Sequence, residues 1–324
     1  MIMTLLSTLI GVCAILALLL GLLPSLADNW PAAFLGGIRA HLAAAALLFS
    51  LSLLFLARSA WLALPLAASV MMCLWVWHLN ERTSQSTIMA EQDRRRLKVI
   101  EFNILRTNRN GAEIARWLEE ADADIIYTLE SRPLADELSA LSKVYPYRAG
   151  CGVLVSACDM MVMSKFPLDR AQFGSMGRLY HNRFFQAAIS VNGTPLTIVA
   201  MHLAKPYFDV HQSKELRSAA ARLKKIEGPI IVAGDFNSSL LSPDIQSFLM
   251  QTGLRSYWDE PRTWPVNAPA LGLPIDHIFV RSPAYIERLD RIEDNMGSNH
   301  YGLEAEVSLP SLADSGISRP ANSQ

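Results

Sequence analysis

The first 80 residues of the chain carry almost no charge. The 324 residues include 29 Lys and Arg and 30 Asp and Glu, but only Asp28, Arg39 and Arg58 lie in this first section. A soluble domain normally has about a quarter of its residues charged, so this section is not an ordinary soluble domain. The remaining residues carry charge at the usual density, which excludes a disordered or fibrous protein.

A positive surplus is lacking as well. The formal net charge is −1, whereas proteins that mainly bind a phosphate polymer usually carry a basic excess. This balance argues against processive binding to a nucleic acid. The chain also has no Gly-x-Ser-x-Gly motif, so it lacks the usual signature of a serine nucleophile.

Cysteine is scarce, with four in the chain. Cys13 and Cys73 lie in apolar runs, where a thiol behaves as a small hydrophobic group. Cys151 and Cys158 lie in the polar section and allow two interpretations. They could close a hairpin as a disulfide, which would indicate an oxidising compartment, or they could be two unrelated buried thiols.

Three apolar runs, at residues 5–23, 35–57 and 60–79, are each about as long as the 20 or so residues that a helix needs to cross a bilayer. Trp61, Trp75 and Trp77 lie near the ends of the third run, as interfacial anchors do. We therefore predict that residues 1–80 form a membrane anchor of three transmembrane helices in the lipid bilayer. A cleaved signal peptide is the alternative for the first run, but no Lys or Arg precedes it and two more runs follow.

The positive charges give conflicting signals about orientation. Arg58 in the turn between the second and third runs favours a cytoplasmic turn, which would place the C-terminal domain outside. Arg39, Arg82 and 94–96 favour the reverse. Adding the cysteine pair, we expect a multi-pass protein of the cell (inner) membrane with its polar domain on the outer face, in the periplasm where the cell has one.

The polar section reads as alternating strands and helices. After a polar linker at residues 81–96, β-branched alternation and apolar runs predict strands, helical spacing predicts two helices, and a Ser/Pro/Asn-rich tail predicts disorder at 310–324. The strands are expected at 97–103, 124–130, 152–163, 187–191, 196–201, 229–233, 275–280 and 303–307, and the helices at 111–121 and 211–226. This order indicates a two-sheet α/β sandwich over residues 97–309, with a site along one edge.

Polar side chains recur where these strands begin or end. Asp235 and Asn237 follow an apolar strand two positions apart, so both can face one substrate. The other strand-end groups are Asn103, Glu130, His202, Asp276, Asn299 and His300. Each could be a cap or a solvated end by itself, but their shared placement indicates a functional site.

With these motifs in this order, the chain from about residue 97 to 307 resembles the endonuclease/exonuclease/phosphatase superfamily, which has the DNase I-like fold. The matching segments are Phe102-Asn103, Leu129-Glu130, Met163 to Leu168, His202-Leu203, Gly234 to Asn237, Ile275 to His277 and Ser298 to His300. The resemblance implies a four-layer α/β sandwich and a metal-dependent hydrolase of phosphodiesters or phosphomonoesters.

The resemblance also implies roles for the matched residues. Glu130 would bind Mg²⁺, or Mn²⁺ in its place, with Asn103 and Asn299 as further oxygen ligands. Asp235 would orient or deprotonate the attacking water, and Asn237 would hold the water or the phosphate. His202 and His300 would donate hydrogen bonds to phosphoryl oxygens, with Asp276 fixing the tautomer of His300. The list of catalytic candidates is therefore Asp235, His300, His202, Asn237 and Asp276.

Two positions depart from the family pattern. Asn299 replaces the usual Asp before the last histidine, which removes a negative charge, and Lys165 replaces the more usual Arg. Asn299 supports the alternative function, a catalytically impaired domain that serves as a membrane scaffold or binding module. The substrate stays open between a nucleic acid, a lipid headgroup and a small phosphate ester.

Overall fold

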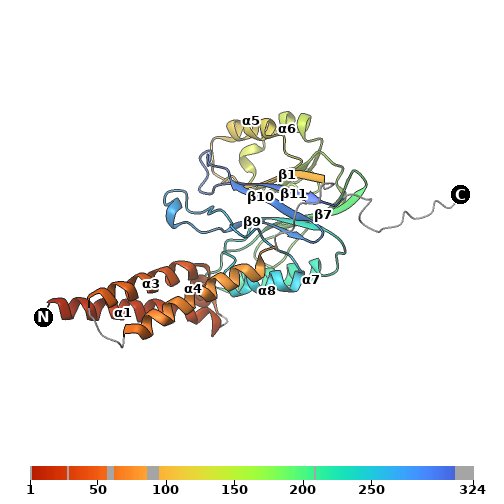
Figure 1. Cartoon of the computed structure of the whole chain (residues 1–324). Coiled ribbons are helices and arrows are strands. Elements are labelled where there is room, and N and C mark those ends of the chain that lie inside the picture. The colour runs from red at the N-terminus through yellow and green to blue at the C-terminus, as the bar shows by residue number, and fades with distance from the viewer. Residues whose placement is uncertain (1, 28, 57–61, 86–94, 208, 311–324) are drawn as a thin grey trace.

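The computed structural model describes residues 2–27, 29–56, 62–85, 95–207 and 209–310. Its N-terminal section is helical: α1 (Ile2–Leu22), η1 (Leu23–Ser25), α2 (Trp30–Gly37), α3 (Arg39–Leu56) and α4 (Ala63–Thr83). Within the described residues, three helices are long and apolar enough to cross a membrane, with mean hydropathies of 2.6, 1.8 and 1.4. α1, α3 and α4 pack together and extend from one side of the sheets (Figure 1). We call α1 to α4 the apolar bundle.

The second apolar run differs from its prediction because a short helix precedes the long one. Asn29 caps α2 by accepting a hydrogen bond from the Ala32 amide at 3.1 Å. The helix ends after Gly37, and Ile38 leaves helical geometry before α3 begins at Arg39. Apolar composition alone does not reveal this break, because both helices are hydrophobic in sequence. The turn with Arg58 lies outside the described residues.

The polar section forms two mixed sheets. The first has the order β10-β11-β1-β2-β4-β3 and the second β5-β6-β7-β8-β9. The first sheet comprises β1 (Arg95–Asn103), β2 (Ile125–Leu129), β3 (Tyr147–Ala149), β4 (Met160–Ser164), β10 (Tyr285–Arg291) and β11 (Leu303–Leu309). The second comprises β5 (Asp169–Gly174), β6 (Phe184–Val191), β7 (Thr194–His202), β8 (Ile230–Asp235) and β9 (Asp276–Arg281).

Helices cover the outer face of each sheet. α5 (Gly111–Ala121) and α6 (Leu138–Val144) lie over the first sheet, and α7 (His211–Leu223) and α8 (Pro243–Thr252) lie over the second (Figure 1). Alternation along β1 divides its side chains between two cores: Val99 packs between the sheets and Ile100 packs under α5. The predicted four-layer DNase I-like sandwich is confirmed.

The strand predicted at 152–163 is wrong over most of its length. Only Met160–Ser164 is strand, and the preceding residues form a loop that the Cys151–Cys158 disulfide closes. Gly150 has a φ of +94°, and a Cβ there would lie 2.2 Å from the carbonyl oxygen of Met160. The loop therefore needs glycine at a position where strand alternation could not continue.

The strands predicted at 187–191 and 196–201 are joined by a two-residue turn at Asn192-Gly193. Both residues have positive φ, +50° and +92°, and they join β6 to β7, which pair antiparallel. Such a two-residue turn matches the twist of the strands that it connects.

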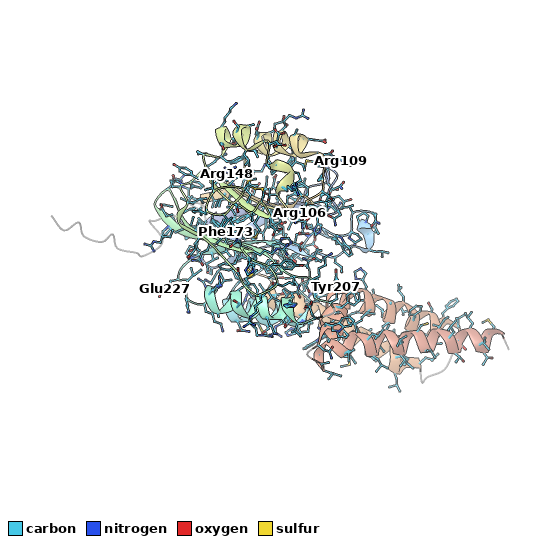
Figure 2. The ribbon with its side chains drawn as sticks, turned by 180° about the vertical axis from the view of Figure 1, so that it is seen from behind. Arg106, Arg109, Arg148, Phe173, Tyr207 and Glu227 are labelled. Carbon is cyan, nitrogen blue, oxygen red and sulfur yellow. A yellow bond between two sulfur atoms is a disulfide. The ribbon has the colours of Figure 1, made fainter. Side chains whose placement is uncertain are left out.

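The sandwich is fastened to the apolar bundle by hydrogen bonds to the bundle's backbone. The Ser239 hydroxyl donates to the Gly37 carbonyl at 2.9 Å, and the Gln246 amide group donates to the Leu79 carbonyl at 3.0 Å. Gly36 fits closely, since a Cβ there would lie 2.8 Å from a carbon of Pro243. Tyr207 lies at this junction in the view from behind (Figure 2).

Candidate active site

Three neighbouring strands of the second sheet bring polar side chains to one edge. His202 at the end of β7 is paired in register with Asp235 at the end of β8, and Asp235 is paired with Asp276 at the start of β9. β7 and β8 run parallel while β9 runs antiparallel to β8, so two strand ends and one strand start meet there. All three side chains are buried.

Asp235 is held in place by its neighbours. Its Oδ1 accepts a hydrogen bond from the backbone N–H of Asn237 at 2.7 Å, and its Oδ2 accepts one from the side-chain amide of Asn103 at 3.1 Å. The Asn103 contact links the two sheets. Gly234 has a φ of +148°, and a Cβ there would lie 1.8 Å from the Met201 carbonyl oxygen, so only glycine permits this approach of β8 to β7.

The loop before β11 carries His300 to the same edge. The Ser298 hydroxyl donates to the Asn103 carbonyl at 2.6 Å and accepts from the His300 amide at 3.1 Å. The His300 Nδ1 then lies 2.8 Å from Asp276 Oδ2. The Asp276–His300 pair predicted from the sequence is therefore formed in the structure.

Burial and neighbouring charges shift the pKa values of His300 and Asp235 at this edge of the sheet. Burial alone would lower the pKa of His300, but the Asp276 carboxylate, with smaller contributions from Asp235 and Glu130, raises it to about 9. Burial and the nearby Asp276 charge raise the pKa of Asp235. At neutral pH His300 is thus protonated on both ring nitrogens, and Nε2 has no hydrogen-bond partner among the described residues.

His202 has a partner that the sequence did not reveal. Its Nδ1 lies 3.0 Å from Asp159 Oδ2, while its Nε2 lies 3.9 Å from Asp235 Oδ2. Asp159 also contacts Arg183 Nε at 2.8 Å. It comes directly after Cys158, in the segment where the sequence predicted a continuous strand, so no pattern marked it as a strand-end residue.

Two further residues were missed. The Thr263 hydroxyl accepts hydrogen bonds from the amides of Ile275 and Asp276 and so fixes the start of β9. Glu101 on β1 is buried, and neither of its carboxyl oxygens has a hydrogen-bond partner among the described residues. Burial, then the charges of Asp276 and Asp235, raise its pKa well above 4.5. An acidic residue within an apolar strand was the available signal for Glu101.

The remaining predicted residues lie around this cluster. Glu130 is half-buried and accepts a hydrogen bond from the Arg106 amide at 2.7 Å. The Asn237 side chain donates to the Leu203 carbonyl at 3.0 Å. Asn299 is exposed and lines a cavity next to His300. The assignment of Glu130, Asn103 and Asn299 as metal ligands stays a prediction.

The site has side chains that could hold a metal ion. One ligand atom each from Asp235, Asp276 and His300 lies within 4.8 Å of the others. Asp276 Oδ1 is buried and has no hydrogen-bond partner among the described residues. A buried carboxylate oxygen in that state suits a hard divalent cation, which prefers oxygen ligands.

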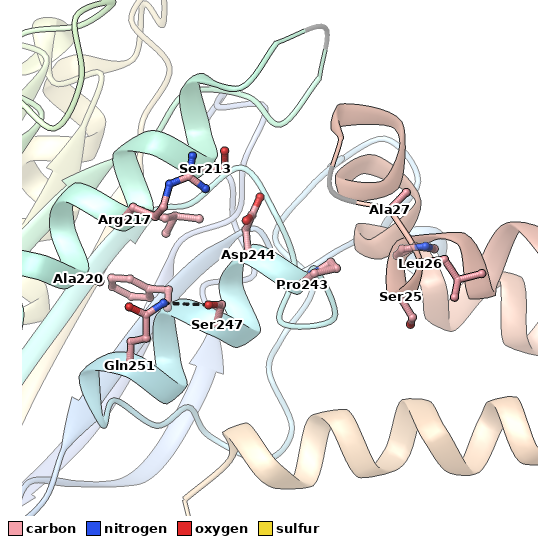
Figure 3. Close-up of a pocket in the computed structure, with 13 residues that line it drawn as sticks. Ser25, Leu26, Ala27, Ser213, Arg217, Ala220, Pro243, Asp244, Ser247 and Gln251 are labelled. Atoms are coloured by element: carbon pink, nitrogen blue, oxygen red, sulfur yellow. Dashed lines mark hydrogen bonds between the residues drawn. The ribbon is translucent and has the colours of Figure 1, made fainter.

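Two cavities lie beside the apolar bundle. One of about 470 Å³ joins the site to α2, and its wall includes Asn237, Asn299 and His300 on one side and Trp30 and Phe34 on the other. We call it the α2 cavity. A second, of about 460 Å³, lies between the end of α1 and helices α7 and α8 (Figure 3). None of the predicted site residues lines the second cavity.

The sequence from residue 100 to 300 matches the model of the Endonuclease/Exonuclease/phosphatase family. The chain belongs to this family. The match covers the whole second sheet, the first sheet except β11 and the start of β1, and every candidate residue of the site. Members of the family are metal-dependent phosphoesterases. A comparison with curated proteins gives no match.

Solved structures of family proteins share the fold. A humanized D. rerio TDP2 aligns at 17% identity with a TM-score of 0.53 and covers 65% of this chain and 98% of its own. A family protein from Leptotrichia buccalis aligns at 16% identity with a TM-score of 0.54, and the alignment covers 65% of this chain and 99% of that protein. A family protein from Bacteroides thetaiotaomicron aligns at 14% identity with a TM-score of 0.55, and the alignment covers 67% of this chain and 99% of that protein. About a third of this chain lies outside each of these alignments.

Proposed function

We propose that the protein is a membrane-anchored, metal-dependent phosphoesterase that hydrolyses a phosphodiester or phosphomonoester by direct attack of water. The observation that carries the proposal is the buried cluster of Asp235, Asp276 and His300 at the sheet edge. Asn103 and His202 contact or approach the same aspartate. A scaffold would not need two buried carboxylates next to a buried histidine and beside a cavity.

The residues divide the work of hydrolysis. Asp235 orients the attacking water and takes one of its protons, a role that its raised pKa favours. The water oxygen bonds to phosphorus while the ester P–O bond breaks, and the leaving oxygen takes up a proton from solvent. His300 and His202 donate hydrogen bonds to phosphoryl oxygens, and Asn237 holds the phosphate.

A divalent cation, Mg²⁺ or Mn²⁺, would supply Lewis-acid polarisation of the phosphoryl oxygen and offset charge in the transition state. We propose Glu130 as its main ligand, with Asn103 and Asn299 as further oxygen ligands. Asp276 Oδ1, which has no hydrogen-bond partner among the described residues, offers a second position beside Asp235.

We further propose that the apolar bundle spans the cell membrane and that the sandwich lies on its outer face. The Cys151–Cys158 disulfide supports this side, because such a bond persists in an oxidising compartment. Arg58 supports it too, since a positive charge in a short turn favours the cytoplasm.

The test of the activity uses the full-length protein in nanodiscs with a soluble diester and a soluble monoester, each with Mg²⁺ and with EDTA. We expect Mg²⁺-dependent hydrolysis that Asp235→Asn or His300→Ala lowers by about 10²- to 10⁴-fold. Thermal unfolding checks that both variants remain folded. Rates within about threefold of wild type in both folded variants would contradict the assigned roles, and inactivity of the wild type would favour the scaffold alternative.

A further inference from the structure

The α2 cavity is polar where it meets the site and apolar where it meets the bundle. Asn237, Asn299 and His300 line the site end, and Lys205 adds a positive charge. Trp30 and Phe34 of α2, with Trp264 and Leu273 from the segment before β9, line the rest. We propose that this cavity holds the hydrocarbon part of a membrane-lipid phosphoester, whose phosphate lies at His300. The inference rests on the proposed phosphoesterase activity.

The charges of the wall suit a phosphate. Among the described residues that line the cavity, none is an aspartate or a glutamate, while Lys205 and His300 are both present. An anionic group can therefore enter past these residues without meeting a like charge in the wall. The cavity's volume of about 470 Å³ is in the range of sites for small ligands, about 300–1,000 Å³.

A buried hydroxyl marks the cavity as a binding site. Ser238 lines it, is only 3% exposed, and its Oγ has no hydrogen-bond partner among the described residues. A buried hydroxyl without a partner is unfavourable because it has given up its hydrogen bonds to water. A polar atom of the ligand near its phosphate would satisfy this group.

The position of α2 favours a ligand from the bilayer. α2 joins α1 to α3, both long and apolar enough to cross a membrane, so it lies where those helices meet the sandwich. The Gly37 carbonyl accepts a hydrogen bond from the Ser239 hydroxyl. The rings of Phe34 and Tyr207 pack edge to face with their centroids 6.3 Å apart. The cavity thus lies between the candidate spans and the reacting groups. The net charge of −1 disfavours a nucleic acid.

Gly37 provides the sharpest variant. It lines the cavity at the last position of α2, and a Cβ added there would have no atom within 4 Å. Leucine at this position therefore occupies the cavity without a clash at its Cβ. Ala40→Leu is the matched control, because Ala40 is exposed on α3 and does not line the cavity.

The experiment measures Mg²⁺-dependent hydrolysis of 4-nitrophenyl alkyl phosphates from methyl to octyl, with the full-length protein in nanodiscs. In wild type, kcat/KM should rise with chain length, by up to about fourfold per added methylene that becomes buried. In Gly37→Leu the ratio of octyl to methyl activity should fall at least about tenfold, whereas Ala40→Leu should keep the wild-type ratio. Because all three proteins are in the same lipid, partition of the esters into the bilayer cancels.

Phosphatidylglycerol, phosphatidic acid, sphingomyelin and single-stranded DNA complete the panel and distinguish a lipid diester from a lipid monoester. Faster hydrolysis of a lipid than of DNA is expected. An unchanged octyl-to-methyl ratio in Gly37→Leu, or a preference for DNA, would overturn the inference while leaving the phosphoesterase activity intact. Failure to hydrolyse both the methyl diester and a soluble phosphomonoester would contradict the proposed function itself. Ala33→Leu, on the same wall, replaces Gly37→Leu if unfolding shows that variant to be unstable.

Discussion

At the scale of single residues, the site depends on aspartates that hold the two histidine rings in place through one ring nitrogen each. Asp276 holds His300 through Nδ1, and Asp159 holds His202 through Nδ1. In both pairs the other ring nitrogen is left to face Asp235 or a substrate. The sequence predicted the first pair through a family motif, but the second joins two segments that no motif connects.

Asp159→Asn should reveal the strength of the second pair through the pH dependence of stability. Burial would raise the pKa of Asp159, but His202 and Arg183 lower it to about 2, against an ordinary value of 3.8. A carboxyl group whose pKa is lowered by folding stabilises the fold at pH values above its pKa in the unfolded chain, here by about 1–2 kcal/mol. This stabilisation is lost as the pH falls from about 4 towards 2.

Thermal unfolding of the two proteins from pH 7 to pH 3 measures this effect. The difference between wild type and Asp159→Asn should be full at pH 7 and shrink below pH 4. Asp169→Asn is the control, because Asp169 is exposed at the start of β5. A difference that stays constant across this range would show that the carboxylate is not held in this way.

Asn299→Asp should lower the Mg²⁺ concentration needed for half-maximal activity, because it restores a negative oxygen ligand beside the cluster. Asn299 is exposed and borders the α2 cavity next to His300. Gln172→Glu adds the same charge at an exposed position on β5, at the far edge of the second sheet. An equal Mg²⁺ requirement in wild type and Asn299→Asp would remove Asn299 from the ligand set.

At the scale of elements, strand ends were predictable and loops were not. Asp235 and His202 follow apolar runs of the kind that form buried strands, so the sequence placed them at one edge. Thr263 and Asp159 act from loops whose paths depend on contacts far along the chain. The span predicted at 35–57 included the last three residues of α2, because apolar residues suit both a helix packed on the sandwich and a transmembrane helix.

The disulfide loop before β4 should stabilise the site as well as the fold. The bond closes a loop of seven residue steps, and Asp159 follows it directly. Cys151→Ser with Cys158→Ser should destabilise the domain by about 2 kcal/mol by the loop-entropy relation and lower activity through His202. A reductant should lower the stability and activity of wild type to the same extent, and it should have no effect on the double variant. Unchanged unfolding of wild type in reductant would contradict the role of the bond.

At the scale of the whole molecule, the fold was predictable because its signals were independent. Charge depletion separated the bundle from the sandwich, and ordered motifs identified the sandwich. The α2 cavity could not be predicted, because it forms only where residues near position 34 meet residues near positions 205, 264 and 299. Nothing in local pattern brings those segments together.

Topology is tested by fusions after Gln324. Three spans place the two termini on opposite sides of the membrane, and we expect the C-terminal side to be outside. An alkaline phosphatase fusion should therefore be active and a green fluorescent protein fusion dark. Fusions at Met1 are the matched control and should give the opposite pattern. A bright C-terminal fusion with an inactive phosphatase would place the sandwich in the cytoplasm.

The contacts between the bundle and the sandwich restrict how the enzyme can turn. The Ser239, Gln246 and Ser256 contacts reach Gly37, Leu79 and Thr83, so two separate helices are held at once. A domain tied at a single point can swivel about its tether, but one fixed at two helices cannot. In the proposed membrane-anchored enzyme, every copy therefore presents its cavity mouth at one height and one tilt. Encounters with substrate would then depend on lateral motion in the plane of the membrane rather than on tumbling of the domain.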